Sequence, residues 1–406
     1  EDLNCDGIFD AGETNPSDPD TDGDGVLDGL DWNPISVDAD GDGINTVTAT
    51  NYTGNLSVTA LGSDIDTASD TVLTGGTGTD TLTITSAGDD DTIIMTGITN
   101  FEKIALVDDG DATADTFTIS VGDANVADGA TLTIDASALE TDDVIVDLSS
   151  EADGNNVVNG GAGVTTVTGS QSDLGDNISG GAGNDIFNFA TANLTSLDTV
   201  DGGSGTDTIK MTNSAVVVDA DFTNMTSVEA LTLVTASHDL TVTLGAEALE
   251  AGIVTITGGT SGTNTTTVGA GYTADLSIVM KGTEVLDASD YTGSLTVTGD
   301  VDLITSNDTL TGGSGNDTLS VSMDGSTDSV AASGMINVTG FETLKFSNDD
   351  AVSVTTHDNN VASGKTLTVN AVAIATQALT FDASNEMDGA VNISAAGSGD
   401  HQITLG

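Results

Sequence analysis

The sequence predicts an all-β fold, an elongated parallel β-helix-like repeat array, from three observations. Val, Ile, Leu and Thr alternate in short runs such as residues 81–85 and 240–244, and a period of two residues gives a strand one apolar face. Gly, Asp and Asn separate these runs, and no Pro follows Pro34, so turns punctuate the strands throughout. Similar strand-and-turn segments recur along the chain, which is typical of stacked units. Tandem β-sandwich units are the alternative architecture.

The charge balance excludes some partners and favours another. The chain has 65 acidic and 5 basic residues and a formal net charge of −60. Such a surface repels a phosphate backbone, so we exclude nucleic acid as a partner. No stretch approaches the roughly 20 apolar residues that span a bilayer, so we expect no membrane insertion. Disorder is the alternative for so acidic a chain, but 37% of the residues are hydrophobic. We expect bound calcium to relieve the charge repulsion and to order the chain.

The first 45 residues form a separate predicted segment, a calcium-binding linker. Residues 2–13 satisfy the loop pattern D-x-[DN]-x-[DN]-G-x5-E, in which side-chain oxygens, one carbonyl and a final Glu surround one calcium ion. Two copies with the same spacing follow, the second ending in Asp and the third lacking a final acid. An acidic disordered linker is the alternative. The predicted ligands are Asp2, Asn4, Asp6, Ile8, Asp10, Glu13, Asp20, Asp22, Asp24, Val26, Asp28, Asp31, Asp38, Asp40, Asp42 and Ile44.

Three prolines argue against the flanking helices of an EF-hand pair in this segment. Pro16, Pro19 and Pro34 stand where the helices of an EF-hand pair would run, and Pro breaks helices. The segment therefore resembles the helix-poor calcium ladders of thrombospondin type 3 repeats, with EF-hand-like loops, and this resemblance implies a stiffening linker.

Residues 46–406 form one predicted β region with internal repeats. Residues 51–59 return as 290–298, and residues 97–104, which contain Phe-Glu, return as 338–345. We divide the region into three approximate units, 46–170, 171–283 and 284–406, which stack because none buries its faces alone. The only helical turn that we expect lies at residues 246–251.

Four nonapeptides carry the chemistry of this region. Residues 75–83 match G-G-x-G-x-D-x-U-x, and so do the nonapeptides that begin at Gly180, Gly202 and Gly312. Only Gly allows a backbone turn tight enough to aim several carbonyls at one ion, and Asp adds negative charge. These motifs resemble the RTX (repeats-in-toxin) family. The resemblance implies a parallel β-roll in which the glycine turns and the Asp hold calcium while the apolar residue points inward.

Three of the motifs have a partial copy nine residues earlier, and the copies are isolated pairs where the family has long tandem runs. A glycine turn without an ion is the alternative for each. The predicted ligands in this region are Gly76, Gly78, Asp80, Asp176, Gly181, Gly183, Asp185, Asp198, Gly203, Gly205, Asp207, Asp308, Gly313, Gly315 and Asp317.

Glycine-aspartate turns among Thr-rich β repeats are similar in style to bacterial S-layer and giant repeat surface proteins. This resemblance implies a secreted, calcium-dependent, self-assembling structural protein of the bacterial cell surface, with copies of itself and cell-surface polysaccharide as partners. The alternative is the stalk of a calcium-rigidified adhesin that binds glycan or a surface. An ice-binding module is a third candidate, although no T-x-T column repeats at fixed spacing.

We expect no enzymatic activity. Neither G-x-S-x-G nor H-E-x-x-H occurs, and the three histidines have no adjacent nucleophile motif. Because residue 1 is Glu, we expect the chain to be a mature or excerpted part of a longer product whose export signal lies outside it.

Overall fold

The chain folds as a parallel β-solenoid. The structure is a computed structural model, and it describes residues 46–65, 72–86, 90–108, 110, 114–233, 239–325 and 328–406. Strands pair in parallel with strands one turn away, for example β4 with β2 and β7. This confirms the predicted all-β repeat array, and the parallel pairing is not that of β-sandwich units. The predicted linker at residues 1–45 lies outside the described residues.

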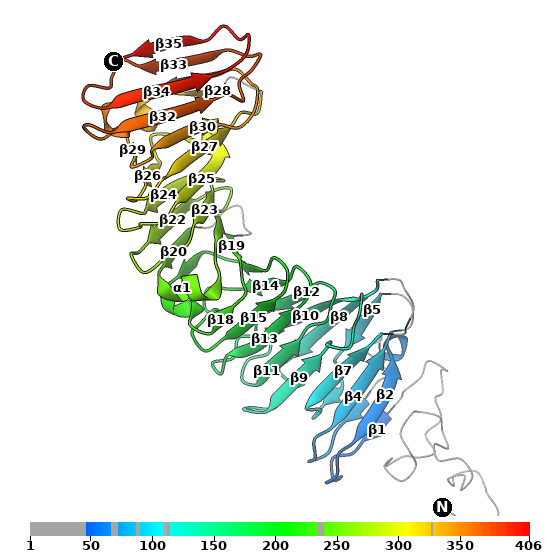
Figure 1. Cartoon of the computed structure of the whole chain (residues 1–406). Coiled ribbons are helices and arrows are strands. Elements are labelled where there is room, and N and C mark those ends of the chain that lie inside the picture. The colour runs from blue at the N-terminus through cyan, green and yellow to red at the C-terminus, as the bar shows by residue number, and fades with distance from the viewer. Residues whose placement is uncertain are drawn as a thin grey trace, which may run out of the picture. The chain divides into compact units, whose positions relative to one another are not determined.

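Two compact units make up the solenoid. Unit 1 comprises the described residues up to 208 together with 224–228, and unit 2 comprises those of 209–223 and 229–406. Figure 1 shows strands stacked in ladders within each unit. The three approximate units that the sequence predicts, 46–170, 171–283 and 284–406, stay a prediction.

Unit 1 contains three ladders. The first, in the order β1-β3-β6, consists of β1 (Thr46–Thr48), β3 (Val72–Thr74) and β6 (Ile98–Thr99). The second, from β2 to β18, consists of β2 (Ser57–Leu61), β4 (Thr81–Thr85), β7 (Lys103–Val107), β9 (Thr131–Asp135), β11 (Asn155–Asn159), β13 (Asp176–Gly181), β15 (Thr199–Gly203) and β18 (Met225–Thr226). The third, from β5 to β14, consists of β5 (Asp91–Ile94), β8 (Thr116–Gly122), β10 (Asp143–Ser150), β12 (Thr165–Thr168) and β14 (Ile186–Phe189).

Unit 2 also contains three ladders. The first consists of β16 (Thr208–Met211), β19 (Ala230–Leu233), β21 (Thr255–Thr257), β23 (Leu276–Val279), β25 (Leu295–Asp300), β27 (Thr318–Ser322), β30 (Thr343–Phe346), β32 (Thr366–Ala371) and β34 (Ala390–Ala395). The second consists of β17 (Ala215–Val217), β20 (Leu240–Leu244), β22 (Thr263–Val268), β24 (Thr283–Asp287), β26 (Thr309–Thr311) and β29 (Val338–Thr339). The third consists of β28 (Asp328–Val330), β31 (Val352–Thr355), β33 (Leu379–Ala383) and β35 (Gln402–Leu405).

Helical segments are short and lie between strands. They are the 3-10 segments η1 (Gly62–Ile65), η2 (Asp219–Phe222), η3 (Val301–Leu303) and η4 (Asp358–Asn360) and the α-helices α1 (Ala246–Ala251) and α2 (Ala332–Met335). Helix α1 confirms the helical turn predicted at residues 246–251. Its residues are Ala, Glu and Leu, which are strong helix formers, and the Asp219 carboxylate of η2 accepts the N–H of Gly245 at 2.7 Å and that of Ala248 at 3.0 Å.

The core is built from apolar columns that run through consecutive turns. Every second residue of a strand such as β4 is buried, and parallel pairing places equivalent residues one above another. In unit 1 one column is Val58, Leu82, Ile104, Ile134, Val158, Ile178, Val200 and Met225. The apolar residue of each nonapeptide, Leu82, Phe187, Ile209 and Leu319, is buried in this way. Burial of these columns is the main favourable contribution to the fold.

Candidate metal centres

The acids of the four nonapeptides are buried in the bends between strands. Asp80, Asp185, Asp207 and Asp317, called the corner acids below, are all 0% exposed. Asp80 accepts the N–H of Leu56 at 2.7 Å and the N–H of Gly76 at 2.5 Å, one on each carboxylate oxygen. Such bonds hold a buried carboxylate in place and satisfy backbone groups that the bend leaves unpaired.

The same arrangement occurs in unit 2, where Asp317 accepts the N–H of Leu295 at 3.0 Å and that of Gly313 at 2.6 Å. The repeated Phe-Glu segment extends it: the N–H of Asp80 donates to Glu102 at 2.7 Å, and the N–H of Asp317 donates to Glu342 at 2.9 Å. Thus an acid of one turn accepts a backbone N–H of the preceding turn, and these hydrogen bonds link consecutive turns.

The acids nine residues before the motifs are buried in a second set of bends. Asp176, Asp198 and Asp308 are at most 2% exposed. Asp198 accepts the N–H of Asp176 at 2.9 Å and that of Thr195 at 2.7 Å. Both oxygens of Asp308 likewise accept backbone N–H groups, from Glu284 and from Thr305, each at 2.7 Å. The structure therefore shows these predicted ligands as acceptors of backbone hydrogen bonds, and calcium at these bends stays a prediction.

The motif glycines allow neighbouring turns to stack backbone on backbone. A Cβ atom at Gly76 would lie 2.2 Å from the carbonyl oxygen of Tyr52, and one at Gly313 would lie 2.2 Å from that of Tyr291. The same close approach to the preceding turn is found at Gly78, Gly181, Gly183, Gly203, Gly205 and Gly315. Packing between turns therefore requires glycine at these positions, whether or not an ion is held.

Burial raises the pKa of two acids that lie between turns of the solenoid, Asp185 and Glu284. Burial raises the pKa of Asp185 to about 6, and the carboxylates of Asp207 and Asp143 add to the shift. Burial raises the pKa of Glu284 to about 7; the amide of Asn264, which donates to it at 2.9 Å, works against the shift, and the Asp308 carboxylate adds to it. Both groups hold a proton more tightly in the folded chain than in the unfolded chain.

We therefore expect stability to fall as the pH rises through this window. Glu284 is protonated in both states below its unfolded pKa of about 4.5, whereas above about 7 the folded state carries the whole cost of its buried charge. By linkage the cost is on the order of 3 kcal/mol. Urea unfolding of the chain at pH 4.5 and pH 8 measures it. Glu284→Gln should make the free energy of unfolding less dependent on pH, and the exposed Glu250→Gln should leave its pH dependence unchanged. An unchanged pH dependence in Glu284→Gln would show that Glu284 is not the group responsible.

Three further clusters of acids lie in the described residues, and each brings three carboxylates together. In each cluster, one oxygen atom from each acid lies within 4.8 Å of the other two. Each combines acids from two successive turns, and each contains one buried acid. We call them the acid triads: Asp123, Glu151 and Asp153 in unit 1; Asp300, Asp302 and Asp328 in unit 2; and Asp358, Glu386 and Asp388 in unit 2.

The first and last triads are built alike. In each, an Asp follows one strand and a Glu-x-Asp-Gly segment follows the neighbouring parallel strand, after β8 and β10 in unit 1 and after β31 and β33 in unit 2. An Asn two residues after the first Asp holds the loop: Asn125 donates to the carbonyls of Met95 and Ile98, and Asn360 donates to those of Met335 and Val338, all at 2.6 to 2.7 Å. The sequence thus forms the same acidic loop twice.

The buried Glu differs between these two triads. Glu151 accepts backbone N–H groups on Oε1 and the side-chain amide of Asn156 on Oε2 at 2.9 Å. Glu386 accepts the N–H groups of Asp388 and Gly389 on Oε1, but its Oε2 is buried and has no hydrogen-bond partner. Val391 stands five residues after Glu386, at the place that Asn156 has after Glu151, and it offers no donor.

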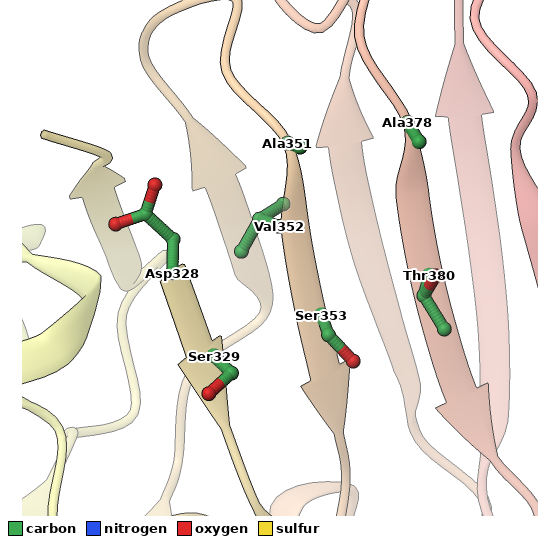
Figure 2. A pocket seen from close by; sticks show the side chains of 7 residues that line it. All are labelled: Asp328, Ser329, Ala351, Val352, Ser353, Ala378 and Thr380. Atoms are coloured by element: carbon green, nitrogen blue, oxygen red, sulfur yellow. The ribbon is translucent and has the colours of Figure 1, made fainter. Parts of the chain in front are cut away.

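The triad of Asp300, Asp302 and Asp328 lies beside β28. Asp300 ends β25, Asp302 lies in η3, and Asp328 begins β28. A shallow groove of about 340 Å³, which Asp328 helps to line, lies over β28, β31 and β33. Figure 2 shows Ser329, Ser353 and Thr380 in a row across these strands, and the carboxylate of Asp328 points away from Val352.

Sequence reasoning did not find the triads. None of their nine acids is among the predicted ligands, because they belong to no glycine motif. A usable signal was present for two of them: Glu-x-Asp-Gly occurs at residues 151–154 and 386–389, each time 28 residues after the partner Asp. The predicted ligands between Asp2 and Ile44 lie outside the described residues.

Comparisons with known proteins give no relative. No helix in the described part of the chain is long and apolar enough to cross a membrane. No protein-family model, no curated protein and no solved structure matches the chain. The solenoid and its acidic clusters, which could bind a metal ion, therefore carry the functional argument by themselves.

Proposed function

We propose that this protein is a secreted, calcium-dependent structural protein of the bacterial cell surface, whose copies assemble into a layer or filament. The acid triads carry the proposal. In each of them, two successive turns of the solenoid place three carboxylates within reach of one ion. Cations at such places tie successive turns of the solenoid together.

Calcium is the ion that these ligands favour. The triads offer only carboxylate oxygens, and hard cations prefer oxygen ligands. Calcium accepts six to eight oxygens in flexible geometry, whereas magnesium demands a near-ideal octahedron and gives up its water reluctantly. Loops between strands provide the flexible kind of site. Outside cells calcium is abundant, which agrees with secretion and a place at the cell surface.

Charge provides the argument for assembly. Two copies of a chain with a net charge of −60 repel each other, because 65 acidic residues face only 5 basic ones; Lys103 forms an ion pair with Asp135 at 2.6 Å. Divalent cations at exposed carboxylates neutralise this charge and bridge copies. Parallel ladders with regular exposed faces are suited to a structural role, and we propose no catalytic one.

We expect millimolar calcium to produce ordered sheets or filaments that disappear on chelation. Negative-stain electron microscopy of the purified chain in calcium, after addition of chelator, and after calcium is restored measures this. Calcium should act because it bridges carboxylates, so magnesium at the same concentration and sodium at the same ionic strength are the controls.

The outcomes separate the proposal from its alternative. Separate particles in calcium that merely loosen with chelator would favour the stalk of an adhesin that binds glycan or a surface. Particles that chelation does not change at all would remove the calcium argument for both functions.

A further inference from the structure

We propose that Asp300, Asp302 and Asp328 bind one calcium ion that holds the start of β28 to the turn before it. The proposal rests on the proposed function only for the identity of the ion. Among the three triads, this one has the least compensated buried charge. The site would therefore decide whether β28, the first strand of its four-stranded ladder, is docked.

Asp328 carries the argument. Its side chain is 4% exposed, and neither of its carboxylate oxygens has a hydrogen-bond partner. A buried carboxylate without partners is strongly disfavoured, and here two more carboxylates lie beside it.

The other two acids are already oriented. Asp300 Oδ1 accepts the N–H of Asp302 at 3.0 Å, and Asp302 Oδ1 accepts the N–H of Ser329 at 3.4 Å. Each uses one oxygen in this way, and the three acids approach within 4.8 Å of one another. Oxygens bound to one calcium ion at about 2.3 to 2.6 Å lie at most about 5 Å apart, so this spacing accommodates the ion.

Among the residues that the structure describes, no ion pair involves Asp300, Asp302 or Asp328. The chain contains 5 Lys and no Arg among its 406 residues, and the ion pair found in the described residues is in unit 1. Two states are therefore open to Asp328: a buried carboxylate whose charge is uncompensated beside two other acids, or a carboxylate with a bound divalent cation. The proposal is that calcium selects the second state when present.

This competition predicts a reversal of stability in Asp328→Asn. Asn has the same shape and no charge, so without calcium the variant should hold β28 as well as the parent or better. Calcium should stabilise the docked β28 in the parent but not in the variant. At a calcium concentration 100 times the dissociation constant, the opening of β28 in the parent should slow by about 100-fold. Asp290→Asn changes an exposed acid of the same unit outside the triads, and it should behave as the parent does.

Hydrogen exchange measured by mass spectrometry on peptides that contain β28 and η3 tests the proposal, together with calorimetric titration of calcium. We expect slower exchange of these peptides in the parent and in Asp290→Asn with calcium, no such slowing in Asp328→Asn, and one fewer bound calcium in that variant. Equal calcium protection of β28 in Asp328→Asn and the parent would overturn the site. Protection that remains at the other triads shows that Asp328→Asn is folded.

The same data separate the site from the proposed function. If calcium protects β28 but electron microscopy shows no assembly, the structural-layer function fails and the site stands. If calcium protects other loops and drives assembly while β28 does not respond in the parent, the site fails and the function stands.

Discussion

Replacing Asp317 with alanine should destabilise unit 2 by about 3 kcal/mol. The substitution leaves the buried N–H of Leu295 and the partly buried N–H of Gly313 without an acceptor, and the loss of an acceptor costs a buried donor about 1 to 3 kcal/mol. Relief of the buried charge offsets part of this, because burial raises the pKa of Asp317. Urea unfolding followed by circular dichroism, with and without calcium, measures the effect.

A matched pair of variants shows which role the corner acid has. Asp317→Asn keeps one acceptor oxygen but turns a donor toward one backbone N–H, so its stability should lie between those of the parent and Asp317→Ala. The exposed Asp290→Ala should change little. A loss that appears only in calcium, together with a missing calcium equivalent, would mean that Asp317 acts as the ligand that its motif predicts and not mainly as a backbone acceptor.

Replacing Gly203 with valine should reduce stability more than any of the other substitutions does and prevent unit 1 from folding. Gly203 has φ of +93°, which β-branched residues avoid. Its Cβ would also lie 2.1 Å from the carbonyl oxygen of Gly181, with which it is in register. Neither turn can move away without breaking the hydrogen bonds between the paired strands, so we expect the free energy of unfolding to fall by more than about 4 kcal/mol. Limited proteolysis and circular dichroism of the purified variant detect it.

Gly129→Ala provides the control for Gly203→Val. Gly129 has φ of +68°, but a Cβ atom at this position would have no neighbour within 4 Å. Gly129→Ala therefore measures the cost of backbone strain alone, about 1 to 2 kcal/mol, without a clash between turns. If the two variants were equally stable, close stacking of the turns would not be the reason for glycine at residue 203.

Local features of the fold could be read directly from the residues. The runs predicted as strands at 81–85 and 240–244 are β4 and β20, and the predicted helical turn is α1. The apolar residues of the nonapeptides are in the core. These predictions succeed because alternation along a strand and helix propensity depend only on near neighbours.

The candidate site was predicted less completely. The motif acids were identified as important, but their observed partners are backbone N–H groups of neighbouring turns. A motif names the acid and the glycine turn, and it does not name what the carboxylate faces. That depends on which backbone groups the next turn leaves unpaired, and therefore on how the turns stack.

The sequence by itself determined the strands, the apolar face of each, the need for glycine at the bends and the net charge of −60. Only the tertiary structure decided which acids meet. Asp328 meets Asp300 and Asp302 because two turns of particular lengths bring them together, and one residue more or less in either turn would move a side chain to another place. Side-chain alternation is local, whereas the register between turns is set by the packing of the whole ladder.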